Sequence, residues 1–201
     1  KKIVICTTKY YQDTEAYLLN NKIAGTDIID IRAFFICGTG DDYFYEDFLQ
    51  YGEKEIFIDA GCCDLGTTAD FAKLCRGLQK VYAFEPDQMN YRKLADRVKN
   101  RSHFICLNKG CYSSEKQMSF AANADMSSSL QEGGNEIVEV TTIDGAVGED
   151  KVAFIKLDIE GAELEALKGA RKVIRRDMPV LAVSAYHKQE DLITLLPYIS
   201  E

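Results

Sequence analysis

From residue 55 onward, short apolar runs alternate with longer segments that show helical spacing. Five apolar runs have the length of buried strands: EIFIDAG (55–61), KVYAFEP (80–86), HFICLNKG (103–110), VAFIKLDI (152–159) and PVLAVSAY (179–186). Helical spacing is found in residues 67–78, 87–100, 162–176 and 188–199. Strands that alternate with helices join by right-handed crossovers and form a parallel sheet with helices on both faces. This alternation predicts an α/β fold.

The N-terminal quarter of the chain is less regular. Its sequence predicts a strand at 2–8 and a helix at 13–23. We interpret residues 1–50 as an N-terminal extension or substrate-side segment, and residues 51–201 as the main domain. The chain begins at Lys1 rather than at methionine, so we expect that an upstream segment is missing. Beyond the regular pattern, short strands are also expected at 117–120 and 136–143.

Composition narrows the class of protein. The formal net charge is -8, which argues against a nucleic-acid surface built on broad basic patches. No apolar run approaches 18 residues, so we predict no membrane span. The seven cysteines form no C-x-x-C pair, and several lie in apolar runs. We therefore predict reduced thiols without disulfides, no zinc site, and a cytoplasmic location.

The loop after the first regular strand has an unusual composition for a nucleotide site. A dinucleotide loop needs G-x-G-x-x-G, but here the spacing is Asp59-x-Gly61 followed by Gly66, with Cys63 in place of the second glycine. Asp59 and Asp64 would repel a pyrophosphate, whereas a ligand with a cationic centre would be tolerated. S-adenosylmethionine, which has a sulfonium and an ammonium but no phosphate, fits this loop. The alternative is a tight strand–helix turn with a solvated Asp64.

The end of the second regular strand supplies another carboxylate. Glu85 follows Asp59 by 26 residues, at a position where a carboxylate can accept hydrogen bonds from both ribose hydroxyls. This supports binding of an adenosine, although NAD enzymes also bind ribose in this way. The alternative is a surface acid before Pro86. Asp87 is well placed to cap the helix that follows.

Charged residues gather at the end of the fourth regular strand. Lys156, Asp158 and Glu160 alternate along FIKLDIEGAE, which indicates a site because charges inside a doubly covered sheet are costly. Glu163 suits the first turn of the next helix by the dipole rule. His187 follows the fifth strand, so we expect its side chain at the same sheet edge as Asp158.

Several of these segments, in order, resemble one known family. The segments are FIDAGCCDLGTT, VYAFEPD, CLNKGCYSSEKQMSF, SSSL, VEVTTID and FIKLDIEGAELEALKGA, the last of which is the most specific. Over roughly residues 40–190 the chain resembles the FkbM family of methyltransferases. The resemblance implies a Rossmann-like class I methyltransferase fold, S-adenosylmethionine as methyl donor, and often a hydroxyl oxygen as acceptor.

The resemblance also implies roles for individual residues. Asp59 and Gly61 would line the methionine part of the cofactor, and Glu85 would hold the ribose. Asn108 would lie near the adenine. Asp158 would face the amino group or the zone of methyl transfer.

The chain departs from the family pattern in two places. Cys62 and Cys63 stand where small or amide residues are more common. The usual sheet has two further strands after the fifth, in an antiparallel hairpin, whereas here a single predicted helix follows. Either the hairpin is absent or the N-terminal segment takes its place.

We therefore predict an S-adenosylmethionine-dependent O-methyltransferase that acts on a small molecule or a saccharide, without nucleic acid or membrane partners. The general base would be Asp158, Glu160 or His187. We predict no metal ion, because no adjacent Asp-Asn pair completes a set of oxygen ligands. Two alternatives stay open: an NAD-dependent oxidoreductase, and a module that binds S-adenosylmethionine without turnover.

Overall fold

The computed structural model describes residues 2–6, 27–29, 44, 51–121, 129–130, 134, 136–188 and 190–200. The helix predicted at 13–23 lies outside these residues. The predicted strand near the N-terminus is present as β1, Lys2–Cys6. Among the described cysteines, five are free: Cys62, Cys63, Cys75, Cys106 and Cys111. The predicted reduced state of the thiols stays a prediction.

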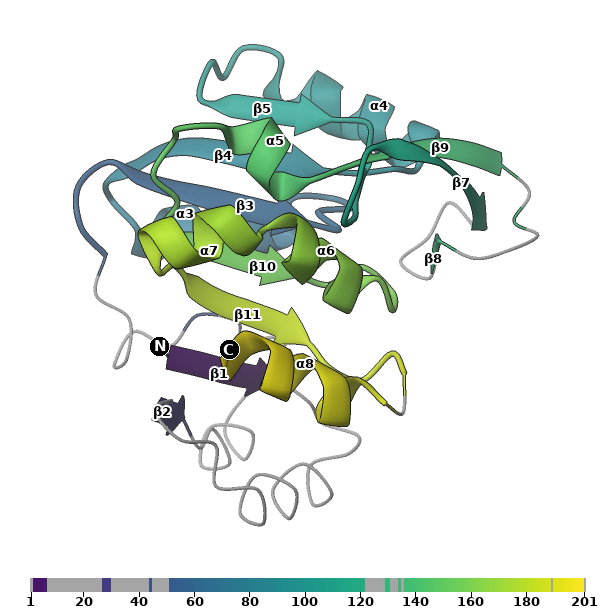
Figure 1. The fold of residues 1–201 in the computed structure, drawn as a ribbon. Coiled ribbons are helices and arrows are strands. Elements are labelled where there is room, and N and C mark those ends of the chain that lie inside the picture. The colour runs from purple at the N-terminus through teal and green to yellow at the C-terminus, as the bar shows by residue number, and fades with distance from the viewer. Residues whose placement is uncertain are drawn as a thin grey trace.

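The core of the fold is a seven-stranded sheet in the order β2-β1-β11-β10-β3-β4-β5 (Figure 1). All of its neighbouring strands are parallel. Its strands are β1, β2 (Asp27–Ile29), β3 (Glu55–Ala60), β4 (Leu78–Phe84), β5 (Phe104–Leu107), β10 (Phe154–Leu157) and β11 (Val180–Ser184). The predicted α/β fold with a mostly parallel sheet is confirmed.

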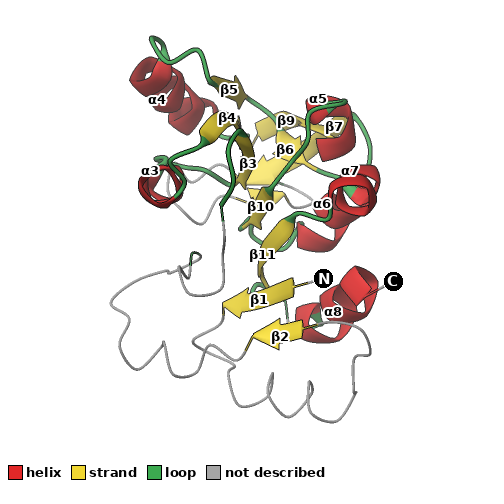
Figure 2. Ribbon diagram, turned by 90° about the vertical axis from the view of Figure 1, so that its left-hand side faces the viewer, coloured by secondary structure: helices red, strands yellow, loops and turns green. Residues whose placement is uncertain are grey.

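Helices cover both faces of this sheet (Figure 2). One face carries α3 (Gly66–Leu74) and α4 (Gln88–Val98). The other carries α5 (Ile143–Val147), α6 (Glu163–Gly169), α7 (Arg171–Asp177) and α8 (Asp191–Ser200). Because side chains alternate along a strand, β3 sends Phe57 to a core under α3 and α4, and Ile58 to a second core under α5–α8. Burial on both faces explains the continuous apolar runs of the sequence.

A smaller sheet stands beside the main one. It contains β6 (Gly110–Cys111), β9 (Glu136–Thr141), β7 (Lys116–Ala121) and β8 (Ser129–Leu130), in that order. Strands β7 and β9 pair antiparallel, from Lys116 with Val140 to Phe120 with Glu136. The two short strands predicted at 117–120 and 136–143 are therefore present.

The edge next to β11 is formed by the N-terminus of the chain. Strand β1 pairs parallel with β11, and β2 pairs parallel with β1. The N-terminal segment thus takes the place beside β11 that the antiparallel hairpin has in the family. This was the second of the two alternatives drawn from the sequence. An unpaired edge strand would expose its backbone donors and acceptors, and β1 covers that edge. The boundary proposed at residue 50 stays a prediction, although β1 and β2 belong to the main sheet.

The prediction of a single helix over 162–176 is wrong, because the structure divides this segment into two helices, α6 and α7, at Ala170. The carboxylate of Asp144, on α5, accepts hydrogen bonds from the backbone N–H groups of Lys172 and Val173 at 3.1 and 2.9 Å. These are orphan donors at the start of α7, so a distant side chain caps the second helix. A Cβ on Gly169 would stand 2.0 Å from the carbonyl oxygen of Tyr112, which explains the glycine before the break.

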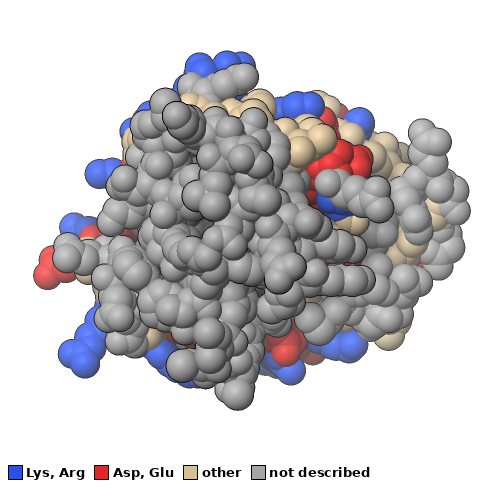
Figure 3. Space-filling view, turned by 90° about the horizontal axis from the view of Figure 1, so that it is seen from below, with Lys and Arg blue, Asp and Glu red and all other residues tan. Residues whose placement is uncertain are grey.

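The surface of the described part carries charges of both signs. In the view of Figure 3, lysine and arginine side chains lie interspersed with aspartate and glutamate around the rim. Across the described ranges, no helix combines the length and the apolar character that crossing a bilayer demands.

Candidate functional site

The predicted site residues lie where parallel strands end. Asp59 is the last but one residue of β3, and Glu85 directly follows β4. Asp158 directly follows β10, and His187 follows β11 by three residues. The carboxyl ends of parallel strands meet at one edge of a sheet, where α/β proteins bind their ligands. Strands β10 and β11 are neighbours, and so are β3 and β10.

Gly61 starts the loop between β3 and α3 in a conformation that favours glycine, with φ of 77°. A Cβ at this position would lie 1.9 Å from the carbonyl oxygen of Asp158. The N–H of Gly61 donates to the carbonyl of Phe84 at 3.1 Å. The glycine therefore lets the loop pass close to the end of β10 while it stays bonded to β4.

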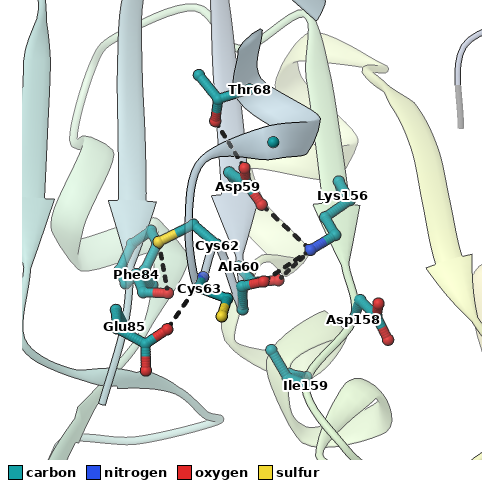
Figure 4. Close-up of polar contacts among 12 residues, drawn as sticks. Asp59, Ala60, Cys62, Cys63, Thr68, Phe84, Glu85, Lys156, Asp158 and Ile159 are labelled. Carbon is teal, nitrogen blue, oxygen red and sulfur yellow. Dashed lines mark hydrogen bonds and ion pairs between the residues drawn. The ribbon is translucent and has the colours of Figure 1, made fainter. Parts of the chain in front are cut away.

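A buried ion pair lies beneath this loop (Figure 4). Asp59 Oδ1 is 3.2 Å from Lys156 Nζ, and the two side chains are 0% and 3% exposed. Lys156 also donates to the carbonyl of Gly61 at 2.8 Å, while the Thr68 hydroxyl donates to Asp59 Oδ2 at 2.6 Å. Burial by itself would lower the pKa of Lys156, but the charges of Asp59 and Asp158 outweigh it and raise that pKa. Lys156 is therefore charged and holds the loop in place.

The ion pair with Lys156 removes Asp59 from the negative charge that the loop can present to a ligand. Asp59 was predicted to contribute negative charge and to line the methionine part of a cofactor, yet it is neutralised by Lys156. All the contacts that the structure shows for its carboxylate are internal. Lys156 was grouped with Asp158 and Glu160, and the structure adds that it lies within β10 and pairs with Asp59. Asp64, which is exposed, and Glu85 keep the acidic character of the loop.

Two carboxylates, Glu85 and Asp64, accept hydrogen bonds from backbone N–H groups of the loop that a phosphate would need. The N–H of Cys63 donates to Glu85 Oε2 at 3.0 Å (Figure 4). The N–H of Gly66, at the start of α3, donates to Asp64 Oδ1 at 2.8 Å. A phosphate at a helix N-terminus is held by such N–H groups. This arrangement therefore fits a ligand without phosphate better than a dinucleotide. Gly66 itself is exposed, and its predicted cofactor contact stays a prediction.

Glu85 is 5% exposed and accepts two backbone hydrogen bonds, from Cys63 on Oε2 and from Asp87 on Oε1 at 2.9 Å. Burial raises the pKa of Glu85 to about 7, although these two hydrogen bonds act in the opposite direction. An ionised carboxylate offers about four lone-pair sites, so each oxygen can still accept another donor. Glu85 thus has the capacity to bind two ribose hydroxyls.

Asn108 and Asp87 shape the segment around Glu85. The side-chain amide of Asn108 donates to the carbonyls of Glu85 and Pro86 at 2.9 and 3.0 Å. Asp87 caps α4 as predicted, and its carboxylate accepts from the N–H groups of Met89 and Asn90. Asn108 therefore orients the turn after β4, while its predicted place near the adenine stays untested.

A carboxylate–imidazole cluster forms at the ends of β10 and β11. We call Asp158, Glu160, Glu163 and His187 the His187 cluster. His187 Nε2 lies 3.5 Å from Asp158 Oδ1 and 3.4 Å from Glu160 Oε2, while Nδ1 lies 3.0 Å from Glu163 Oε1. Asp158, Glu160 and His187 meet here as the sequence predicted, and their catalytic roles stay predictions.

The protonation of His187 follows from these neighbours. Burial alone would lower the pKa of His187, but the hydrogen bond to Glu163 and the charges of Glu163, Glu160 and Asp158 raise it above its usual value. The Tyr186 hydroxyl donates to Asp158 Oδ1 at 3.2 Å. These carboxylates therefore stabilise the imidazolium form of His187 relative to an isolated histidine.

Sequence reasoning missed two members of this edge. Glu163 was assigned to the helix dipole, yet its side chain is 0% exposed and lies against His187. Tyr186 was given no role of its own. Its position beside His187, two residues after β11, was the one available signal.

Comparison with known proteins identifies a family. The model of the methyltransferase FkbM domain matches residues 59–200, which include the glycine loop, Glu85 and the whole His187 cluster. The chain belongs to the FkbM methyltransferase family. Membership of this family implies S-adenosylmethionine as cofactor and favours a methyltransferase over the oxidoreductase alternative.

A solved structure shares the fold. The chain is similar to the methyltransferase FkbM from Methylobacillus flagellatus KT, with a TM-score of 0.66 and 26% sequence identity. The match covers 96% of this chain but 48% of that chain, so the chain spans about half the length of this relative. A search of curated proteins found no match.

Proposed function

We propose that this FkbM-family protein transfers a methyl group from S-adenosylmethionine to a hydroxyl oxygen of a small molecule or saccharide. The observation that carries the proposal is a division of one sheet edge into two parts. The loop that begins at Gly61 after β3, together with Glu85 after β4, forms one part. The His187 cluster forms the other, at β10 and β11.

The first part suits the cofactor. Glu85 would accept the ribose hydroxyls, and Gly61 lets the loop lie against the carbonyl of Asp158, where a side chain would clash. Cys63 and Gly66 already donate their N–H groups to carboxylates, so the loop suits a nucleoside that has no phosphate. S-adenosylmethionine supplies an electrophilic methyl group on a sulfonium.

The second part suits an acceptor that must lose a proton. Methyl transfer to a hydroxyl needs a group within hydrogen-bond reach of that hydroxyl. Asp158, Glu160 and His187 are the candidates, and an oxygen of each carboxylate lies within 3.5 Å of the imidazole Nε2. Asp158 and Glu160 retain 20% and 33% of their side-chain exposure, so an acceptor can reach them.

Two measurements test the proposal. Calorimetric titration should show binding of S-adenosylmethionine or S-adenosylhomocysteine in the micromolar range, about -8 kcal/mol, and weaker or absent binding of NAD. Release of S-adenosylhomocysteine with a panel of hydroxylated acceptors then separates an enzyme from a module that only binds the cofactor.

Substitution of the histidine tests the acceptor part. If His187 is the base, His187→Ala should lower turnover about 10²–10⁴-fold while cofactor affinity stays close to that of the wild type. Equal turnover in the two proteins, with S-adenosylmethionine bound normally, would assign the proton transfer to Asp158 or Glu160.

A further inference from the structure

We propose that the His187 cluster binds a divalent metal cation through Asp158, Glu163 and His187. One ligand atom from each of these residues lies within 4.8 Å of the others. Bonds of about 2.0–2.2 Å place the ligands of one cation roughly 3–4 Å apart, so small side-chain adjustments close the site. This inference departs from the expectation of no metal, which considered only Asp158 and Glu160.

Glu163 supplies an independent indication of a missing partner. Its side chain is 0% exposed, and Oε1 accepts from the N–H of Ile159 at 3.0 Å and lies 3.0 Å from His187 Nδ1. The second oxygen, Oε2, is buried too and has no hydrogen-bond partner within the described residues. A buried carboxylate oxygen without a partner is costly. A cation beside this carboxylate would supply the partner.

The two faces of the imidazole suit a metal ligand. Nδ1 faces Glu163, while Nε2 faces Glu160 at 3.4 Å. A histidine that binds a metal through one nitrogen commonly donates its other N–H to a carboxylate, which fixes the orientation of the ring. Nε2 also lies 3.5 Å from Asp158 Oδ1, so a carboxylate lies beside each ring nitrogen, and whichever nitrogen binds the cation leaves the other to donate to a carboxylate.

The ligand set points to a class of cation. Magnesium and calcium prefer oxygen ligands alone, whereas an imidazole with carboxylates suits a first-row transition metal such as Mn²⁺. Asp158 retains 20% of its exposure, which leaves a route for the ion and for a further ligand.

The effect of the cation rests on the proposed function, whereas its binding does not. A cation at the acceptor edge would bind the acceptor hydroxyl and lower its pKa, so that the oxygen reacts with the methyl group more readily.

The test uses Mn²⁺ on the whole chain after treatment with a chelator. Mn²⁺ is the better probe, because softer ions such as Zn²⁺ prefer sulfur ligands and would compete for the seven cysteines. Calorimetry and electron paramagnetic resonance should show one Mn²⁺ per chain. Glu163→Gln and Asp158→Asn should each weaken binding at least about tenfold. The matched control is Glu165→Gln, on the same helix, which should bind Mn²⁺ like the wild type.

Three results would overturn the inference: no Mn²⁺ bound by the wild type, unchanged binding in Asp158→Asn, or an equal loss in Glu165→Gln. Circular dichroism checks that Glu163→Gln is folded, and the partly exposed Asp158 provides the second variant if it is not. Titration of S-adenosylmethionine without metal tests the proposed function separately. Cofactor binding without Mn²⁺ binding would refute the metal site alone, and the reverse result would refute the proposed function alone.

Discussion

Binding of the cofactor should release a proton from Glu85. Burial raises the pKa of this carboxyl to about 7, so close to half of the free chains carry the proton at pH 7. Ribose hydroxyls donate hydrogen bonds, and the ionised carboxylate accepts them better than the neutral acid. The complex should therefore hold Glu85 ionised, and at pH 7 about half a proton should be released per cofactor bound.

The same equilibrium sets the pH dependence of affinity. Only the ionised fraction binds well, and at pH 6 that fraction is about one tenth, whereas at pH 8 it is about nine tenths. The dissociation constant for S-adenosylhomocysteine should therefore rise about tenfold between pH 8 and pH 6. The direction follows from the sign of the shift: a raised carboxyl pKa favours the protonated, weakly binding form as the pH falls.

Calorimetry in buffers of different ionisation enthalpy measures the proton release directly. Glu85→Gln keeps the shape of the side chain and removes its titration. The difference between wild type and Glu85→Gln also cancels protons that come from the ligand's amino group. Equal release in both proteins, or a flat affinity between pH 6 and 8 in the wild type, would refute the ribose role of Glu85.

Three other predictions concern stability and are measured by urea or thermal unfolding. Lys156→Met should cost about 3–5 kcal/mol because it leaves the Asp59 carboxylate buried without its partner, and adding Asp59→Asn should recover much of this loss. If the free energy of unfolding of Lys156→Met alone lay within about 1 kcal/mol of the wild type, this would contradict the buried pair. Gly61→Ala should cost more than Gly148→Ala, since both have positive φ but only the first Cβ meets a backbone carbonyl, at 1.9 Å. Equal costs would remove the close approach as the cause. Asp87→Ala should lose about 1–2 kcal/mol with its two cap hydrogen bonds, and an unchanged unfolding midpoint would contradict the cap.

Much of the fold follows from local patterns. Strands buried on both faces must be apolar throughout, so β3, β4 and β10 were visible as continuous runs. The cap of α4 was visible because Asp87 acts on its own helix, two and three residues away. Features whose cause lies within a few residues are those that a single sequence determines.

The candidate site was predictable in part, through topology. Strand ends of a parallel sheet share one edge, which was enough to expect Asp158 and His187 together. Glu163 was missed because a first-turn acid has a sufficient local explanation in the helix dipole. Its burial against His187 depends on how α6 packs beside β11, which no local pattern records.

The sequence by itself determined the alternation of strands and helices, the glycine loop and the order of the charged strand ends. The tertiary structure decided which of those charges face one another. Lys156 pairs with Asp59 because β10 and β3 are neighbours with these two residues in register, 97 positions apart in the chain. It also decided that β1 completes the sheet at β11, and that Asp144 caps α7. Such contacts join segments distant in sequence, and they form only when the hydrophobic faces pack, so their energies are absent from any local window of residues.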